Sequence, residues 1–426
     1  MSAAALEEWL RRLETRTPPE RIELGLERVA EVWQRLGSPR LAQHTIVVAG
    51  TNGKGSCVAL AEAFLQAQGL VTAAYTSPHL LRFTERLRIA GEESNAQDWV
   101  AAFEVVEKAR QQTQLTYFEF TTLAAFWVMA QQSPALDVAL LEVGLGGRLD
   151  AVNVMDADAV LLTSIDLDHQ DWLGTDREQI GAEKAGVLRA GQVAVSVEAS
   201  PPDSVVQAAA ALGVSLLQRD RDYQRSVTGE HWEWRDATRT EHQLPFPALA
   251  GAFQLDHAAA VLTLLQQLGE RGDLPSLTRN AIEHGLRSVR LAGRRQMIPR
   301  NDQGGMWLLD VAHNPHAAIA LADELAAMPA RAWCVLGMLK DKDNAAFVAA
   351  LRPAIEGWFL IGLKGTRGQP AAGLAMRTGL DLSDAYEDLG QAMDAAEVYA
   401  ASADCIVITG SFHTVAAALT YLQAAR

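Results

Sequence analysis

The chain contains few cysteines, and they form no pattern. Its 426 residues include only Cys57, Cys334 and Cys405, which are scattered and make no C-x-x-C pair. This scarcity argues against a disulfide framework and against a metal site built from cysteines. It is also typical of proteins kept in a reducing compartment, so we expect a cytoplasmic protein.

An excess of positive charge and a long apolar run are also missing. Lys and Arg number 37 against 52 Asp and Glu, which gives a formal net charge of −15. Without a basic stripe, we expect no broad binding to nucleic acid or to an anionic membrane surface. The longest apolar stretch, FTTLAAFWVMA, is too short to span a bilayer and is expected to form a buried helix. The charged N-terminal segment MSAAALEEWLRRLETR does not resemble a signal peptide.

No internal repeat or low-complexity tract is present; instead, apolar runs alternate with helical patterns. This alternation predicts an α/β fold with mostly parallel strands. Short alternating segments in residues 215–247 predict a small antiparallel addition. Before and after that segment, the pattern predicts strands at 44–50, 71–75, 137–144 and 158–165 and helices at 56–69, 96–112, 119–132, 176–189, 254–268 and 275–287.

The pattern breaks at GRRQMIPRNDQGG (293–305), which reads as a linker or a hairpin, and then restarts. The restart predicts a second, smaller α/β domain with strands at 306–312, 332–338, 357–363 and 404–410. Helices are expected after these strands, one of them from Pro315 and one at the C-terminus. The chain is long enough for two domains with cores of their own. We therefore predict domains at 1–290 and 291–426.

The stretch VVAGTNGKGSCVAL (47–60) places three glycines between a predicted strand and the start of a predicted helix. Backbone N–H groups and the helix dipole attract an anion at such a position. Lys54 can reach the terminal phosphates of a nucleotide. The usual P-loop has glycine where this chain has Val48, and here Gly55 separates Lys54 from Ser56. The pattern predicts a variant phosphate-binding loop, with an ordinary glycine-rich turn as the alternative.

Polar residues follow several predicted strands, where open parallel sheets bind ligands. Glu142 is a carboxylate in an apolar strand, so it needs a compensating cation, either Mg²⁺ or Arg148. Taken singly, Ser77 in TSPH reads as a turn or cap residue, and His169 reads as a core or surface histidine. Lys184 in GAEKAGV reads as a solvated helix lysine. Gathered at one edge, these residues suit a site for ATP and Mg²⁺.

In the second predicted domain, DVAHNPH (310–316) follows a strand in the same way. Asp310, His313 and Asn314 could form an Asx-type turn and a helix cap before Pro315. The alternative is that they belong to the nucleotide site.

Several longer strings carry a family resemblance. They include VAGTNGKGS, YTSPHL, TYFEFTT, LEVGLGGRLDAVN, SIDLDHQDWLG, EKAGVLR, DVAHNPHAA, GMLKDKD and GSFHTV. Together they resemble the folylpolyglutamate synthase family, and more closely its bifunctional dihydrofolate synthase/folylpolyglutamate synthase members. These are ATP-dependent amide ligases related to the Mur peptidoglycan ligases. The resemblance runs from about residue 13 to the C-terminus.

The resemblance implies a P-loop ATP-binding domain followed by a smaller Rossmann-like domain, with ATP and Mg²⁺, as one or two ions, as cofactors. It implies that Lys184 can carry a carbamate. It also implies that Lys54, Lys184 and His313 serve catalysis. The residues implied for ATP are Thr51, Asn52, Gly53, Lys54, Gly55, Ser56, His257, Arg294 and Asp310; those for the metal are Ser77, Glu142 and His169.

The same resemblance implies a surface that binds dihydropteroate. Its residues would be Thr116, Tyr117, Phe118, Glu119, Leu149, Asp150 and Ala151, with Thr15–Pro18 as a third part. Phe118 could offer a ring face to a flat pterin, and core packing is the alternative for this residue. One departure concerns His257, because family members commonly carry Asn at that position.

These matches predict that L-glutamate is added to dihydropteroate and to tetrahydrofolate through an acyl phosphate. The TYFE and LDA strings favour both activities over a folylpolyglutamate synthase alone. A Mur-type ligase for a nucleotide-linked peptide is less expected, because the loop near residue 50 leaves no room for the additional N-terminal domain of those enzymes. A further alternative is a P-loop switch protein that hydrolyses ATP. We expect a monomer that binds only small molecules.

Overall fold

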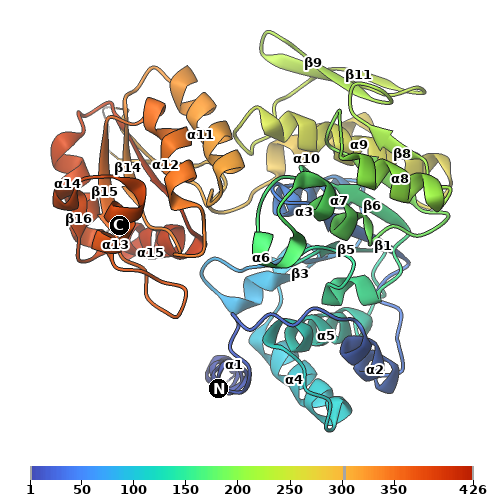
Figure 1. Cartoon of the computed structure of the whole chain (residues 1–426). Coiled ribbons are helices and arrows are strands. Elements are labelled where there is room, and N and C mark those ends of the chain that lie inside the picture. The colour runs from blue at the N-terminus through green and yellow to red at the C-terminus, as the bar shows by residue number, and fades with distance from the viewer. Residues whose placement is uncertain (1, 301–303, 425–426) are drawn as a thin grey trace. The chain divides into compact units, whose positions relative to one another are not determined.

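The computed structural model describes residues 2–300 and 304–424. The chain forms two compact units, which we describe separately (Figure 1). The first unit comprises the residues up to Ala248 together with Gln254–Arg290. The second comprises Leu249–Phe253 and the residues from Leu291 onward.

An eight-stranded sheet forms the centre of the first unit, in the order β4-β3-β2-β5-β1-β6-β7-β8. The six strands β2-β5-β1-β6-β7-β8 pair in parallel with their neighbours. At the other edge, β3 pairs antiparallel with β2, and β4 pairs antiparallel with β3. The predicted α/β class with mostly parallel strands is confirmed. The strands are β1 (His44–Ala49), β2 (Thr72–Tyr75), β3 (Leu87–Ile89), β4 (Glu92–Glu93), β5 (Val138–Glu142), β6 (Ala159–Leu162), β7 (Val193–Ser196) and β8 (Leu216–Gln218).

Helices cover this sheet, and their starts follow local capping rules. Asn95, Asp176 and Thr278 each accept a backbone N–H from the first turn of the helix that follows. Such caps satisfy donors that a helix start leaves without partners. The helices are α1 (Ser2–Arg16), α2 (Glu27–Arg35), α3 (Lys54–Ala67), α4 (Ala96–Arg110), α5 (Tyr117–Ala130), α6 (Gln170–Leu173), α7 (Arg177–Ala185), α8 (Asp203–Ala211), α9 (Phe253–Glu270) and α10 (Arg279–Ser288).

The segment 215–247 was only partly predicted. Its first strand, β8, extends the main sheet in parallel instead of joining the antiparallel addition. The predicted addition is the three-stranded sheet of β9 (Gln224–Thr228), β10 (His231–Arg235) and β11 (Thr240–Leu244). Three residues of β8 are too few for alternation to reveal which sheet a strand joins.

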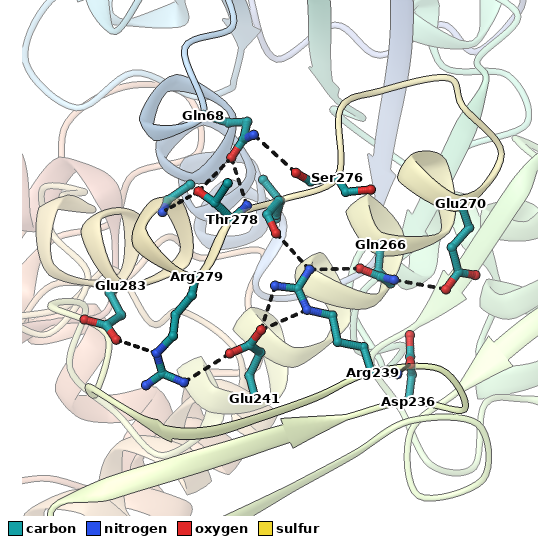
Figure 2. A network of polar contacts seen from close by, with 12 residues as sticks. Gln68, Asp236, Arg239, Glu241, Gln266, Glu270, Ser276, Thr278, Arg279 and Glu283 are labelled. Atoms are coloured by element: carbon teal, nitrogen blue, oxygen red, sulfur yellow. Dashed lines mark hydrogen bonds and ion pairs between the residues drawn. The ribbon is translucent and has the colours of Figure 1, made fainter.

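A polar network joins this small sheet to the helices beside it (Figure 2). Arg239 donates to Glu241 Oε1 at 2.6 Å, to Gln266 Oε1 of α9 at 3.1 Å and to the Leu277 carbonyl at 2.8 Å. Arg279 of α10 donates to the other oxygen of Glu241 at 3.1 Å. Since α10 packs on α3, this network supports the helix that follows the glycine-rich loop.

The second unit contains a six-stranded sheet in the order β12-β13-β17-β14-β15-β16, parallel except for β12. Strands β12 and β13 pair antiparallel, as the hairpin reading of 293–305 predicts; residues 301–303 of that segment lie outside the described residues. The strands are β12 (Gln296–Pro299), β13 (Met306–Leu309), β14 (Ala332–Leu336), β15 (Gly357–Ile361), β16 (Ala385–Tyr386) and β17 (Cys405–Thr409). The helices are α11 (Pro315–Ala327), α12 (Asn344–Leu351), α13 (Ala371–Thr378), α14 (Leu389–Tyr399) and α15 (Phe412–Ala424).

Within the described part of the chain, none of the helices has both the length and the apolar content that crossing a membrane requires.

Candidate active site

The glycine-rich loop joins β1 to α3, as the sequence predicts. A Cβ at Gly50 would lie 1.7 Å from Thr163 Oγ1, and Gly53 has φ of 93° at the N-cap of α3. Both positions therefore require glycine. Lys54 donates from Nζ to the carbonyls of Gly50 at 3.0 Å and Thr51 at 3.1 Å. Helix α3 begins at Lys54, so the loop's N–H groups lie at a helix start, where an anion is favoured.

Hydrogen bonds tie this loop to the segment after β6. Thr51 donates its N–H to the Ser164 carbonyl at 2.6 Å and its hydroxyl to the Asp166 carbonyl at 3.0 Å. Ser164 Oγ donates to the Asn52 carbonyl at 3.2 Å. The loop is thus fixed against the segment that leads to His169.

Lys184 is buried, with 3% of its surface exposed, so the solvated-lysine alternative is wrong. Helix α7 turns it toward the loop, where its Nζ donates to the Gly50 carbonyl at 2.8 Å. Burial and the nearby charge of Lys54 lower the pKa of Lys184 to about 7. A lysine that loses its proton near neutrality can act as a nucleophile, for example toward CO₂.

Three strands bring the predicted metal ligands to one edge of the sheet. Ser77 follows β2, Glu142 ends β5 and His169 follows β6, and these strands flank β1 in the order β2-β5-β1-β6. The Ser77 N–H donates to Glu142 Oε2 at 3.3 Å, and Glu142 is buried. Residue His169 has φ of 51° at the N-cap of α6.

The alternative partner of Glu142 was Arg148, and this pairing is wrong. Arg148 donates to Glu183 Oε1 at 2.7 and 3.1 Å, and Glu183 lies in α7 near the end of that helix. Within the described residues, no group of three or more His, Cys, Asp and Glu side chains is arranged to hold a metal ion. The predicted set contributes two such side chains, Glu142 and His169, and one hydroxyl.

Two residues of the predicted substrate surface have structural partners at the start of α5. Thr116 caps the helix, and Glu119 accepts the Thr116 N–H at 2.7 Å, which completes a capping box. Arg28, which sequence reasoning missed, donates to Glu119 Oε1 at 2.8 Å. The carboxylate of Glu119 is therefore engaged by the protein itself. Tyr117 is buried, and burial raises its pKa to about 12.

Phe118 is the half-buried residue of that first turn. Its ring lies against Gly144, where a Cβ would be 2.4 Å from the ring, and 6.5 Å from the ring of Tyr75. Asp150 is fully buried and accepts the N–H groups of Leu145 at 2.7 Å and Val152 at 2.9 Å. Burial raises the pKa of Asp150 to about 6. Beside it, Ala151 is buried, and the carbonyl of Leu149 accepts the Gly25 N–H at 3.3 Å.

His257 lies on α9 against the loop. A Cβ at Gly53 would lie 2.3 Å from its Nε2, and its Nδ1 is 3.1 Å from Gln254 Oε1. Gln254 donates from Nε2 to Ser56 Oγ at 3.3 Å, so its Oε1 is an acceptor and Nδ1 of His257 carries the proton. Burial lowers the pKa of His257 to about 4. The one donor of a neutral ring is thus used inside the protein, and Nε2 faces the loop as an acceptor.

The second unit holds Asp310 in a buried ion-pair group. Asp310 Oδ2 lies 3.1 Å from Nε of Arg295, whose Nη1 lies 3.0 Å from Glu324. The preceding Arg294 lies over the Phe412 ring at 5.0 Å. Arg295 was not predicted, because two adjacent arginines in a sequence give no signal of which one is buried.

The other residues of that motif also have local roles. His313 Nδ1 lies 2.9 Å from the Val311 carbonyl, and Asn314 caps α11 by accepting the Ala317 N–H at 3.0 Å. The helix-cap alternative is therefore confirmed for Asn314. With Nδ1 donating to a carbonyl, a neutral His313 keeps Nε2 as an acceptor.

The fold and the glycine-rich loop identify the general class of enzyme to which this chain belongs. The family model described as "Mur ligase, glutamate ligase domain" matches residues 293–412, in the second unit. With its glycine-rich loop between β1 and α3 in the first unit, the chain is a ligase of the Mur type.

Similar proteins narrow the class. The dihydrofolate synthase/folylpolyglutamate synthase of Escherichia coli K12 is 41% identical over 427 residues, covering 100% of this chain and 97% of that protein. The chain therefore belongs to the dihydrofolate synthase/folylpolyglutamate synthase family.

Two solved structures of the family are similar over nearly their full length. E. coli FolC in complex with DHPP and ADP is 40% identical, with a TM-score of 0.92, over 100% of this chain and 99% of that one. A bifunctional folylpolyglutamate synthase/dihydrofolate synthase with Mn, AMPPNP and L-glutamate bound is 42% identical, with a TM-score of 0.89, over 98% of each chain.

Proposed function

We propose that this chain is an ATP-dependent amide ligase that adds L-glutamate to dihydropteroate and to tetrahydrofolate. The observation that carries this function is the glycine-rich loop with two lysines, Lys54 and Lys184, on the same Gly50 carbonyl. Lys54 at the start of α3 supplies a cation for the anionic phosphates of ATP, and the buried amine of Lys184 lies beside it. The relatives named for both activities support the substrates.

The reaction proceeds in two steps. A substrate carboxylate oxygen attacks the γ-phosphorus of ATP, so that ADP leaves and an acyl phosphate forms. The amine of L-glutamate then attacks the acyl carbon, phosphate leaves, and an amide results. The protein contributes position and charge neutralisation to such a transfer, chiefly through Lys54, and forms no covalent bond with the substrate. By family resemblance, Thr51, Asn52, Gly55 and Ser56 hold the phosphates together with Gly53.

We propose Mg²⁺ as the metal, held by Ser77, Glu142 and His169. A hydroxyl, a carboxylate and an imidazole leave several positions for phosphate oxygens and water, as Mg²⁺ usually has beside a nucleotide. Glu142 is buried at the end of β5 and accepts the Ser77 N–H, so two of the three proposed ligand residues lie next to each other. When bound, the metal would neutralise phosphate charge. A relative with Mn and AMPPNP supports a divalent ion in this family.

We further propose that Lys184 carries a carbamate. Its amine is buried, and its lowered pKa leaves it partly unprotonated at neutral pH, which reaction with CO₂ requires. A carbamate would replace a second positive charge beside Lys54 with a negative one. Mass measurement of the intact protein with and without bicarbonate tests this assignment, and an unchanged Lys184 under both conditions would refute it.

For the pterin, we propose a surface that includes Phe118, Leu149, Asp150 and Ala151. Phe118 is half-buried, so its ring can present a face. Thr116, Tyr117 and Glu119 act on this surface by shaping the start of α5, since the carboxylate of Glu119 is already paired with Arg28. Asp150 holds the preceding loop through its backbone contacts.

In the second unit, we propose that Arg294 and Asp310 contact the nucleotide and that His313 assists catalysis. His257 of the first unit would accept a hydrogen bond from ATP at Nε2. The functional division would then be a P-loop ATP- and folate-binding domain at 1–290 and a Rossmann-like ligase domain at 291–426. We also propose that the protein is cytoplasmic and monomeric.

One assay tests the function. Phosphate release from ATP is measured with dihydropteroate, tetrahydrofolate or neither, each with and without L-glutamate. We expect stoichiometric, glutamate-dependent release with both folate substrates. Glutamate-dependent release with tetrahydrofolate but not with dihydropteroate would indicate a folylpolyglutamate synthase that lacks dihydrofolate synthase activity. Release without any folate substrate would indicate an ATPase switch.

A further inference from the structure

A buried arginine without a carboxylate partner lies beside the candidate site. Arg86 ends the short helix η1 (Phe83–Arg86), and only 8% of its surface is exposed. Its Nε donates to His79 Nδ1 at 2.9 Å, and its guanidinium carbon lies 5.4 Å from the Phe83 ring centroid and 5.9 Å from that of Tyr117. Among the residues that the structure describes, no Asp or Glu pairs with it.

Other enclosed arginines of this chain do have such partners. Arg88, two residues further on, pairs with Glu62 at 2.7 Å, and Arg295 pairs with Asp310. The carboxylate nearest to Arg86 in sequence, Glu85, instead accepts the backbone N–H groups of residues 80–82. A buried charge is costly unless it is paired, so the open donors of Arg86 call for an anion.

The position of Arg86 shows where that anion would lie. Its carbonyl accepts the Thr76 N–H at 2.8 Å, directly before Ser77, and its guanidinium contacts Tyr117, directly before Phe118. The backbone of Arg86 is thus tied to the segment that leads to the proposed metal ligand Ser77, and its guanidinium lies beside the start of the proposed pterin surface. Neither Nη1 nor Nη2 of Arg86 is a completely buried atom that lacks a hydrogen-bond partner among the described residues. The outer edge of the guanidinium is therefore accessible to solvent.

We propose that Arg86 binds the non-reacting carboxylate of the terminal glutamate of the folate substrate. This inference rests on the proposed function. Dihydropteroate brings one carboxylate, which must be phosphorylated, whereas the terminal glutamate of tetrahydrofolate brings two. The planar guanidinium fork matches a carboxylate that stays intact throughout the reaction.

The reacting carboxylate is a poorer match for Arg86. That group must attack phosphorus, and its negative charge is lost from its oxygens as the acyl phosphate forms. A guanidinium bound to it would stabilise the substrate more than the transition state and would oppose the reaction. Arg86 is therefore a specificity residue for chain extension rather than a residue of the phosphoryl transfer itself.

The test combines a variant with a changed substrate. Arg86→Gln removes the charge; Arg82→Gln, four residues earlier, is the control, because Arg82 is exposed and pairs with Glu93. The substrates are dihydropteroate, tetrahydrofolate and a tetrahydrofolate analogue whose non-reacting carboxylate is a carboxamide. The readout is kcat/KM for each, with a thermal melt of each protein.

We expect wild type and Arg82→Gln to prefer the acid over the carboxamide by about 10- to 100-fold, as charge-assisted hydrogen bonds predict. Arg86→Gln should lose this preference, and its activity should fall more with tetrahydrofolate than with dihydropteroate. An acid preference that survives in Arg86→Gln, or equal losses on both natural substrates, would overturn the proposal.

Should Arg86→Gln fail to fold, Arg86→Lys retains the charge and loses the fork. We expect this variant to have a smaller acid preference than wild type, and an unchanged preference would again overturn the proposal. Failure of the proposed function is distinguishable, because wild type would then release no glutamate-dependent phosphate with any substrate.

Discussion

At the residue scale, the loop lysine shows how chemistry and stability can be separated. Lys54 is half-buried and donates to the carbonyls of its own loop, Gly50 and Thr51. Its contribution to packing is therefore small, whereas we propose that its charge neutralises the phosphates of ATP.

We predict that Lys54→Ala nearly abolishes ligation and leaves the fold intact. Loop substitutions outside the core usually change the free energy of unfolding by about 0.5 kcal/mol or less. The measurement is glutamate-dependent phosphate release, with circular dichroism and a thermal melt as controls. Turnover at the wild-type rate by a folded variant would contradict the role of this loop.

His257 gives a prediction about pH. Its folded pKa of about 4 lies below the ordinary value of 6.5, so the unfolded chain binds a proton first as pH falls. The stabilising effect of a neutral His257 is complete above pH 6.5 and is lost as pH falls toward 4. The maximum loss is on the order of 3 kcal/mol, since each pKa unit corresponds to about 1.4 kcal/mol.

Urea unfolding of wild type and His257→Asn between pH 4 and 7.5 measures this effect. Asn cannot titrate, and it is the residue that family members commonly carry here. We expect the difference in stability between the two proteins to change across this pH window in favour of the variant at low pH. A difference that does not depend on pH would show that His257 does not titrate below 6.5 in the native state.

At the element scale, the start of α5 separates residues that shape a helix from a residue that can meet a ligand. Thr116 and Glu119 form the capping box, whereas Phe118 is half-buried against Gly144.

Phe118→Ala should therefore reduce kcat/KM for dihydropteroate, by up to about tenfold if one ring stacking contact of about 0.5–1.5 kcal/mol is lost. The controls are kcat/KM of the same variant with tetrahydrofolate and a melting curve. If the ratio of kcat/KM for dihydropteroate to kcat/KM for tetrahydrofolate is unchanged while the melting temperature falls, Phe118 belongs to the core.

The three-stranded sheet is a second case at this scale. Arg239 joins β11 to α9 and to the loop before α10 through three partners (Figure 2). We expect Arg239→Ala to lower the free energy of unfolding by about 1–3 kcal/mol, because Glu241 would lose its closest cation. Arg235→Ala on β10 is the matched control, since Arg235 is exposed and donates only to Gln224. Equal urea midpoints for the two variants would show that the Arg239 network does not stabilise the protein.

At the scale of the whole molecule, the three cysteines report on the two units separately. Cys57 lies in the first unit, and Cys334 and Cys405 lie in the second; all three are free and buried. Burial raises the pKa of each thiol, to about 12 for Cys405, and the thiolate is the reactive form.

We predict that none of these thiols reacts with Ellman's reagent in the native protein on the timescale of minutes, and that all three react in denaturant. Mass spectrometry at rising urea then shows whether Cys57 becomes labelled at the same concentration as the other two. Rapid labelling of the native protein would contradict the buried positions of the cysteines.

The sequence by itself determined the alternation of strands and helices and the glycine-rich loop. The apolar run at 44–50 is rich in β-branched residues, which favour a buried strand, and glycine spacing is local. Neighbouring elements in the chain are enough to place Lys54 at the start of α3. The family strings then identified the chemistry.

Only the tertiary structure decided the partners of charged side chains. Lys184 reads as a solvated lysine in its own helix, yet the packing of α7 buries it on Gly50. Arg148 pairs with Glu183, and of two adjacent arginines Arg295 is the buried one, which pairs with Asp310. Among the described residues, no carboxylate pairs with Arg86, which donates to His79 instead. A sequence lists charges in order along the chain, but their pairing depends on distances across the fold, which no local pattern encodes.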